Sequence, residues 1–268
     1  MTKIYYISDI HLEFGAMALP DPDTDDNILL LAGDIIPAKY LDSPEADTFF
    51  GVQCAKYKKV FFILGNHEHY GYVYDDTAKA FSDYFREKKF DITLCQSDYI
   101  ELNDEWSLLA DTLWTDFNKD DWFAKNTAKQ CMNDFRIVTK IVNGTQWSSP
   151  IYRRLLPEDV LVDHRATLAS FLEDLEQNPN KKFIVMTHHL PSEQCVNAMF
   201  ANDSLNPAFF SELAPFIMDH PNIKYWIHGH THCSVNVKIG ECQVLCNPRG
   251  YVGNGENKEF DSNASFEI

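Results

Sequence analysis

The segment Val60–His69 reads VFFILGNHEH and decides how this chain folds. Five apolar residues in a row, followed by a glycine, predict a short strand that is buried on both faces. Such strands are typical of parallel sheets, because both faces of a parallel sheet are covered. Asn66, His67, Glu68 and His69 come directly after this strand. Ligand sites of open α/β sheets lie at the carboxyl ends of the strands, so we expect these side chains to belong to a functional site.

Four more apolar runs have the same form, at residues 4–7, 28–31, 183–186 and 225–227. In chain order, the residues that follow them and could bind metal are Asp9 and His11, Asp34, His188 and His189, and finally His228, His230 and His232. Eight of the ten histidines fall in these clusters. One such cluster alone would be typical of hydrogen-bonded core or surface histidines. Their recurrence at successive strand ends predicts a metal centre at a sheet edge.

The pattern of apolar residues predicts a mixed α/β sandwich. Strands are expected near 3–8, 28–32, 59–64, 92–95, 99–102, 106–110, 182–187, 224–227, 234–239 and 241–246, with a short closing strand at 266–268. Helices are expected near 44–57, 75–89, 157–177 and 206–219. A chain of 268 residues fits a single domain spanning residues 1–268.

The stretch from Leu113 to Pro150 is the least regular part of the chain and is rich in aromatic residues. These are Trp114, Phe117, Trp122, Phe123, Phe135 and Trp147. We expect an insertion that is either a lid over the metal site or a helical excursion packed on the core. Packing is the more common role for any single aromatic residue here. As a lid, the segment could stack on a base or cover an apolar leaving group.

Charge and composition restrict the classes of partner. The net charge of −17 disfavours a nucleic-acid-coating protein, because such proteins present clustered Lys and Arg to the phosphates. No apolar stretch approaches the roughly 20 residues of a membrane span, and because the first predicted strand begins at Lys3 we expect no signal peptide. Seven cysteines spread along the chain fit a reducing compartment. We therefore expect a cytoplasmic protein without a membrane partner, of open oligomeric state.

The candidate ligands mix oxygen and nitrogen donors. Carboxylate together with imidazole suits Mn, Fe, Zn or Ni better than Ca or Mg. Asp9 and His11 are two residues apart, as are His230 and His232. The members of each pair can therefore project to one side of an extended chain. The carboxylate of Asp34 has two oxygens and could be shared by two metal ions.

The ordered set of motifs resembles the calcineurin-like metallophosphoesterase superfamily over nearly the whole chain. The motifs are Asp-x-His, Gly-Asp, Gly-Asn-His-Glu, a histidine after the 183–186 run, and Gly-His-x-His. The resemblance implies a four-layer α-β-β-α sandwich, with two mixed sheets flanked by helices, and two divalent transition-metal ions, Mn or Fe being favoured. The implied ligands are Asp9, His11 and His232 for one ion, Asn66, His188 and His230 for the other, and Asp34 as the bridge.

The resemblance also implies a phosphoesterase. A hydroxide bridging the two ions would attack phosphorus, and His67 would protonate the leaving group, unless it only hydrogen-bonds to Asp34 or Glu68. Protein phosphatases of the superfamily carry Gly-Asp-x-x-Asp-Arg-Gly, whereas residues 33–38 read GDIIPA and lack the phosphate-clamping arginine. We expect a small phosphodiester or nucleotide-like substrate; a phosphomonoesterase and a DNA or RNA nuclease are the alternatives. The start ISDIHL and the late NPRGY resemble small bacterial and phage phosphohydrolases.

Further side chains are candidates for binding the substrate, namely Arg136, Arg249, His69 and Tyr70. Either arginine could contact phosphate through two parallel hydrogen bonds, although a solvent-facing ion pair is the more common role. His69 and Tyr70 could line the cleft beside Asn66. Two other classes of protein remain to be considered. A binding module that has lost activity would normally lack some of the ligand residues, and all are present. A metal-storage or purely structural metal site would favour closed coordination by four ligands per ion, whereas the seven candidate ligands, one of them shared, leave room for water at both ions.

Overall fold

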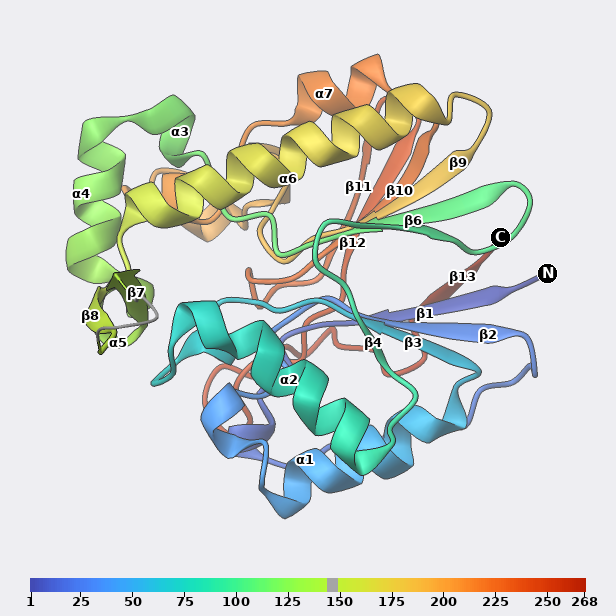
Figure 1. Cartoon of the computed structure of the whole chain (residues 1–268). Helices are drawn as coiled ribbons and strands as arrows, with labels where there is room; N and C mark the ends of the chain where they lie inside the picture. Colours follow the sequence, from blue (N-terminus) through green and yellow to red (C-terminus); the bar gives the residue numbers. More distant parts are fainter. Residues whose placement is uncertain (144–148) are drawn as a thin grey trace.

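Two large mixed β-sheets pack face to face, and helices cover the outer face of each sheet (Figure 1). The computed structural model describes residues 1–143 and 149–268. Among these residues, no helix combines the length and the apolar character that crossing a membrane requires. The arrangement confirms the predicted four-layer α-β-β-α sandwich.

The first sheet comes mainly from the N-terminal part of the chain. Its strand order is β13 (Ser265–Glu267), β1 (Lys3–Ile7), β2 (Asn27–Leu31), β3 (Lys59–Phe62) and β4 (Thr93–Leu94). Strands β1 to β4 run parallel to one another. The closing strand β13 pairs antiparallel with β1, so the sheet is mixed.

The second sheet is mixed in the same way. Its strand order is β11 (Val235–Ile239), β12 (Cys242–Cys246), β10 (Ile223–His228), β9 (Lys182–Met186), β6 (Trp106–Ala110) and β5 (Asp98–Glu101). Strands β6, β9, β10 and β12 are parallel, whereas β5 and β11 pair antiparallel at the edges. The loop after β1 contacts the loop after β10, so parallel strands of both sheets deliver their carboxyl ends to one place.

Helices α1 (Pro44–Thr48) and α2 (Tyr74–Lys88) cover the first sheet, and α6 (Pro157–Gln177) and α7 (Ala214–Asp219) cover the second (Figure 1). The short helical turns are η1 (Leu12–Phe14), η2 (Ala38–Tyr40), η3 (Phe49–Gln53), η4 (Cys54–Lys56), η5 (His67–His69), η6 (Glu193–Cys195), η7 (Ala198–Phe200) and η8 (Asn206–Ala208). The turn η5 follows β3, and η6, η7 and η8 follow β9. Both strands carry candidate ligands at their carboxyl ends.

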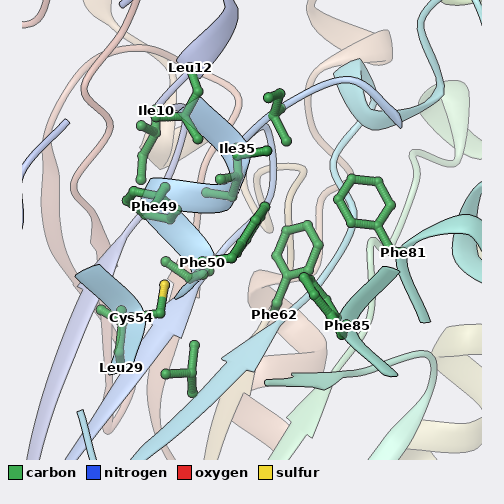
Figure 2. Packing of buried hydrophobic residues seen from close by; sticks show 14 of the residues in the cluster. Ile10, Leu12, Leu29, Ile35, Phe49, Phe50, Cys54, Phe62, Phe81 and Phe85 are labelled. Atoms are coloured by element: carbon green, nitrogen blue, oxygen red, sulfur yellow. The ribbon is translucent and has the colours of Figure 1, made fainter. Parts of the chain in front are cut away.

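The apolar runs are buried on both faces of each sheet, which explains why they do not alternate with polar residues. In β2, Ile28 and Leu30 pack between the two sheets. Leu29 and Leu31 of the same strand pack against the helices instead. Figure 2 shows part of this second cluster, including Leu29, Phe49, Phe50, Phe62, Phe81 and Phe85. Burial of each aromatic side chain stabilises the fold by about 1.5–3 kcal/mol. This core therefore holds the strands that carry the site in place.

The strand predictions are confirmed, including the short closing strand. The helices predicted for residues 75–89 and 157–177 are confirmed as α2 and α6. The segment predicted as one helix at 44–57 is helical over residues 44–56, but it changes from α1 to the π-helical turn η3 and then to η4. Periodicity alone does not distinguish these helix types.

The single helix predicted for residues 206–219 is wrong. Only η8 and α7 are helical there, and Phe210 between them forms a β-bridge with Leu190. Pro207 and Pro215 explain the break, because proline fits only the first turn of a helix. Each of these prolines stands at the start of one of the two short helices. The apolar residues in between therefore belong to a loop.

The irregular segment 113–150 forms an excursion at the end of the sandwich opposite the chain termini (Figure 1). Its elements are α3 (Phe117–Asp120), α4 (Trp122–Cys131), α5 (Asp134–Ile137) and β7 (Thr139–Asn143), and β7 pairs antiparallel with β8 (Ile151–Arg154). Of the aromatic residues expected to matter in this segment, Trp147 lies outside the described residues.

The other aromatic residues of this segment fall into two groups. Trp114, Phe117 and Phe135 are buried in a cluster with the first turns of α6. Trp122 and Phe123 are 65% and 73% exposed on α4. The buried group packs the excursion onto the rest of the protein.

Candidate metal centre

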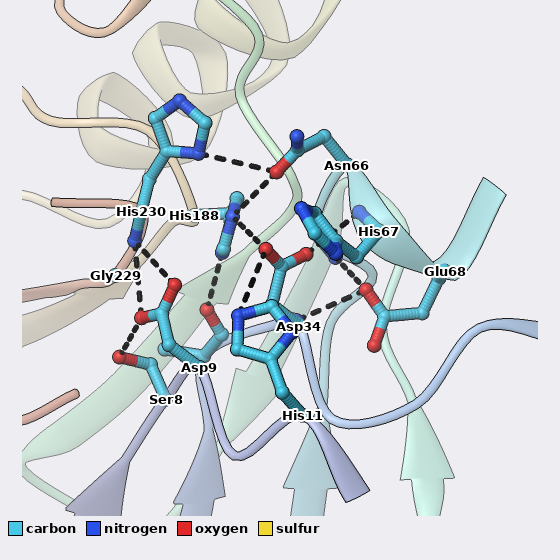
Figure 3. A network of polar contacts seen from close by, with 12 residues as sticks. Ser8, Asp9, His11, Asp34, Asn66, His67, Glu68, His188, Gly229 and His230 are labelled. Carbon is cyan, nitrogen blue, oxygen red and sulfur yellow. Dashed lines mark hydrogen bonds and ion pairs between the residues drawn. The ribbon is translucent and has the colours of Figure 1, made fainter. Parts of the chain in front are cut away.

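Candidate ligands from five strand ends meet in one cluster (Figure 3). They are Asp9 and His11 after β1, Asp34 after β2, Asn66 after β3, His188 after β9, and His230 and His232 after β10. All of them except His232 are buried. Buried polar groups need hydrogen-bond or metal partners, and here the nearest partners are largely one another.

Five of these residues have left-handed backbone conformations. Their φ angles are 50° at Asp9, 49° at His11, 57° at Asp34, 69° at His230 and 51° at His232. Positive φ is uncommon outside glycine and tends to occur at functional sites. Strands β1 and β10 end before these residues. The paired ligands therefore converge through tight turns, and the strand alternation from which we predicted their convergence is not the cause.

The first group of donors consists of Asp9, His11 and His232. The Nε2 atoms of His11 and His232 are 3.1 Å apart, and His232 Nε2 lies 3.3 Å from Oδ1 of Asp9. The other ring nitrogen of His11 is 3.3 Å from Oε1 of Glu13. One carboxylate oxygen and two imidazole nitrogens thus face a common point, which is the donor set expected for a transition metal.

The second group of donors surrounds the side chain of Asn66. Its Oδ1 lies 3.1 Å from His188 Nε2 and 3.1 Å from His230 Nδ1. His188 Nδ1 lies 2.8 Å from the backbone oxygen of Ala32. A proton on Nδ1 donated to that oxygen leaves Nε2 with its lone pair free, as a metal ligand requires.

The carboxylate of Asp34 lies between the two groups. Its Oδ2 is 3.9 Å from Nε2 of His11, in the first group, and 3.4 Å from Nε2 of His188, in the second. Its Oδ1 accepts the backbone N–H of His67 at 2.8 Å. One oxygen is thereby anchored by the backbone, and the other faces both groups of donors.

Electrostatics make this cluster favourable for cations. Burial alone would lower the pKa of His188, but the charges of Asp34 and Asp9 raise it to about 10. Burial alone would raise the pKa of Asp34, but His188 and His67 hold it well below its ordinary value. Positive charge is therefore strongly stabilised here, and metal ions would meet the same field. Donor types and charge both fit bound metal.

Two further residues hold the loops after β2 and β3 in place. Gly33 has a φ of +86°, and a Cβ there would lie 2.5 Å from Nδ1 of His188. The buried carboxylate of Glu68 accepts the backbone N–H groups of Asp34 at 3.0 Å and Gly65 at 2.7 Å. Burial and the charge of Asp34 raise the pKa of Glu68 to about 8, although His188 and the backbone N–H groups of Gly65 and Ile35 act to lower it. The Gly-Asp and Gly-Asn-His-Glu motifs therefore carry structural as well as chemical residues.

Asp134 of α5 fixes the orientation of Asn66. Its Oδ1 accepts hydrogen bonds from Nδ2 of Asn66 and from the hydroxyl of Tyr70, both at 2.8 Å. Because the amide nitrogen is held on that side, the oxygen of Asn66 faces His188 and His230. Asp134 was not predicted, since a lone aspartate in an irregular segment follows no motif.

His67 lies at the edge of the cluster. Its ring stacks on Tyr70 with 4.0 Å between centroids. Its Nε2 is 3.3 Å from the hydroxyl of Tyr251, and its Nδ1 is 3.8 Å from Oε1 of Glu13. Burial alone would lower the pKa of His67, but Asp34 and Glu13 raise it above its ordinary value. Tyr251 belongs to the NPRGY segment, which thus contributes directly to the site.

The two candidate arginines differ in their surroundings. The guanidinium of Arg249 donates to the backbone oxygens of Gly15 at 2.8 Å and Ala16 at 3.1 Å. It therefore fastens the loop after β1. Arg136 is exposed on α5, two residues from Asp134.

Three other histidines near the motifs are buried in packing positions. Nδ1 of His69 lies 2.9 Å from Oγ1 of Thr77, its ring stacks on Tyr74 at 4.4 Å, and burial lowers its pKa to about 3. Burial also lowers the pKa of His228 to about 4. His189 lies beside His230, with 4.4 Å between ring centroids. These three rings are buried beside the loops that carry the candidate ligands, and they fill space there.

Comparison with known proteins agrees with this geometry. The family model described as calcineurin-like phosphoesterase matches residues 2–234. A relative from Acanthamoeba polyphaga mimivirus, named uncharacterized protein L509, is 26% identical over 293 residues, which cover 100% of this chain and 97% of the relative.

Solved structures share the fold at low sequence identity. The phosphopantetheinyl hydrolase PptH from Mycobacterium tuberculosis superimposes with a TM-score of 0.67 at 14% identity, covering 93% of this chain and 90% of that one. A dimetal phosphatase from Danio rerio has a TM-score of 0.51 at 12% identity, covering 94% and 88% of the two chains.

Proposed function

This chain belongs to the calcineurin-like phosphoesterase family, and from that premise we propose that it hydrolyses a small phosphodiester at a two-metal centre. The family implies a metal-dependent hydrolase. The number of ions, the roles of individual residues and the substrate are our proposals, and each rests on the geometry of the cluster.

The position of Asp34 is the observation that carries the proposal. Its Oδ2 lies within 4 Å of histidine nitrogens from both groups of donors. We assign Asp9, His11 and His232 to one ion, Asn66, His188 and His230 to the other, and Asp34 to both. Mixed oxygen and nitrogen donors favour transition metals, and we propose Mn or Fe. When bound, two such ions orient a phosphate, activate water and stabilise the entering and leaving oxygens.

His67 is our candidate for protonating the leaving group. Its ring is held by Tyr70 on one face and lies near Tyr251 at Nε2. Glu13, on the Nδ1 side, favours the protonated imidazole. An imidazole positioned beside a reacting phosphate can donate a proton near neutral pH. The remaining candidates, Arg136, Arg249, His69 and Tyr70, are proposed at most to shape the cleft.

A diester fits this site better than a monoester. The chain lacks the arginine that clamps the phosphate in family members with Gly-Asp-x-x-Asp-Arg-Gly, and Arg249 is engaged by backbone oxygens. A dianionic monoester loses more from a missing cationic partner than a monoanionic diester does. The net charge of −17 would repel long polyanions, which places a nuclease third.

The test combines metal analysis with a substrate panel. Protein reconstituted with Mn²⁺ or Fe²⁺ should contain close to two ions per chain and should cleave bis-p-nitrophenyl phosphate faster than p-nitrophenyl phosphate. Cyclic nucleotides and single-stranded DNA complete the panel. A single ion per chain after full loading would contradict the shared role of Asp34. Faster cleavage of long single-stranded DNA than of any small diester would favour the nuclease.

A further inference from the structure

An apolar pocket of about 120 Å³ opens beside the second group of donors. It is formed mostly by the loop after β9. Its apolar walls are Leu190, Val196, Phe200, Leu205 and Phe209. Ligand pockets have mainly apolar walls, and an engineered apolar cavity of about 150 Å³ binds benzene. The volume and lining of this pocket therefore suit a short alkyl chain or a small ring.

The pocket adjoins the proposed metal ligands directly. The ring of Phe209 lies 4.5 Å from that of His230, measured between centroids. Thr231, another wall residue, stands between His230 and His232 in the chain. The backbone N–H of Leu190 donates to the oxygen of Phe209 at 3.1 Å, which ties the two walls together. A group bound in the pocket would therefore lie next to a phosphate held at the donor cluster.

The polar residues that the loop after β9 contributes to the pocket are hydrogen-bonded within the protein. Asn197 accepts the backbone N–H of Met199 at 3.0 Å, and Asn206 donates to the oxygen of Phe200 at 2.7 Å. Asp203 accepts the backbone N–H of Leu205 at 2.9 Å. These contacts leave mainly apolar surface to face a ligand, and the charge of Asp203 would repel a second anionic group.

We propose that this pocket binds an uncharged, apolar ester group of the substrate, which is the group that stays on the phosphate. The inference rests on the proposed phosphodiesterase function and narrows its substrate class. Figure 3 shows His230 and His67 on opposite sides of the Asn66 oxygen. A leaving group protonated by His67 would depart on that side, and the retained group would then lie toward His230 and the pocket.

The experiment keeps the leaving group constant and varies the retained one. Methyl, propyl and hexyl p-nitrophenyl phosphates are hydrolysed to p-nitrophenolate and the alkyl phosphate, so the bond that breaks is the same in each. Full burial of one methylene should raise kcat/KM about fourfold, and half burial should raise it about twofold. Over the five methylenes that separate the methyl and hexyl esters, we expect kcat/KM to rise about 30-fold.

Variants of one exposed aromatic residue in the pocket test where this gain arises. Phe200 is 43% exposed, so Phe200→Ser should fold normally, and it should reduce the gain to about fivefold while leaving hydrolysis of the methyl ester unchanged. Phe123→Ser is the matched control, because Phe123 is 73% exposed on α4 and does not line the pocket, so this variant should keep the full gain. Calorimetric titration of the metal-loaded protein with methylphosphonate and hexylphosphonate provides a readout without turnover.

The outcomes separate the two proposals. If the methyl ester is cleaved but chain length has no effect on kcat/KM or on phosphonate affinity, the pocket proposal is overturned and the phosphodiesterase proposal stands. If both aromatic variants lose the gain equally, the pocket is not its source. If no ester is cleaved with any metal, the proposed function fails and the pocket inference fails with it.

Discussion

Replacing Asp134 by alanine should weaken metal binding although Asp134 is not itself a proposed ligand. Its carboxylate accepts the amide N–H of Asn66 at 2.8 Å. Without it, the amide can rotate and present nitrogen, which is no metal ligand, toward His188 and His230. Nδ2 of Asn66 also donates to the hydroxyl of Tyr70 at 3.1 Å. That hydroxyl now donates to Asp134, and without this acceptor it could turn its proton toward the amide oxygen instead. Affinity should fall at the ion that we assign to Asn66.

The size of the effect follows from the bond that is lost. A hydrogen bond to a charged group contributes about 1.5–3 kcal/mol, and about 1.4 kcal/mol corresponds to a tenfold change in affinity. The affinity for the second ion should therefore fall about 10–100-fold, the usual range when the partner of a metal ligand is removed. Asp134→Asn keeps an acceptor oxygen without the charge and should lose about fivefold, because charge-assisted bonds are about twice as strong as neutral ones.

Competition between the protein and a fluorescent chelator for Mn²⁺ measures this affinity directly. Asp163→Ala is the matched control, because the Asp163 carboxylate likewise accepts a tyrosine hydroxyl, that of Tyr74 at 2.5 Å, but belongs to no contact with Asn66 in the described residues. Thermal unfolding of both variants checks that the fold is intact. A folded Asp134→Ala protein that binds two Mn²⁺ ions as tightly as wild type, or an equal loss in Asp163→Ala, would refute the reasoning.

Three further predictions test the assignment of roles. Asp34→Ala or Asn66→Ala should lose metal and activity together, as seen by elemental analysis and ester hydrolysis; loss of activity with both ions retained would contradict the ligand roles. His67→Ala should keep both ions and slow alkyl leaving groups by about 10²–10⁴-fold, with a much smaller effect on p-nitrophenolate; equal losses on both would rule out the acid. Gly33→Ala combines a left-handed backbone, worth about 1–2 kcal/mol, with a Cβ 2.5 Å from a histidine nitrogen, so urea unfolding should show a larger loss than Gly253→Ala. Gly253 has a φ of +75° and open space around it, and equal losses would show that the clash has no effect.

The strands were predictable because apolar residues surround them on both faces. A strand covered on both faces, such as β2 with Leu29 toward the helices and Leu30 toward the other sheet, must be apolar throughout, and the sequence shows this as an unbroken run. The helix predicted for 206–219 is wrong because apolar spacing alone does not reveal the effect of Pro207 and Pro215, each of which stands at the start of a separate short helix. A proline cannot continue a helix beyond its first turn, even where the spacing of apolar residues would fit one.

The site was only partly predictable. Residues in motifs, such as Asp34 and Asn66, could be named, but Asp134 and Glu13 could not. These two act through other side chains, and the distances that matter join segments far apart in the chain: Asp134 is 68 positions from Asn66. The pocket beside His230 was likewise unpredicted. The expectation that residues 113–150 contact the substrate stays a prediction, and the walls of the pocket proposed here come mostly from the loop after β9.

The left-handed turns explain why the ligands could be named although their geometry could not be derived. Each non-glycine residue in this conformation costs about 1–2 kcal/mol, and the surrounding structure must offset that cost. The backbone N–H of His230 lies 3.1 Å from each carboxylate oxygen of Asp9, and that of His67 donates to Asp34 at 2.8 Å. Each carboxylate thus faces the cluster and also holds the neighbouring loop through its backbone. Removing the carboxylate of Asp9 or Asp34 would release a loop that carries another proposed ligand. We therefore expect the loss of one of these carboxylates to displace further donors from the cluster.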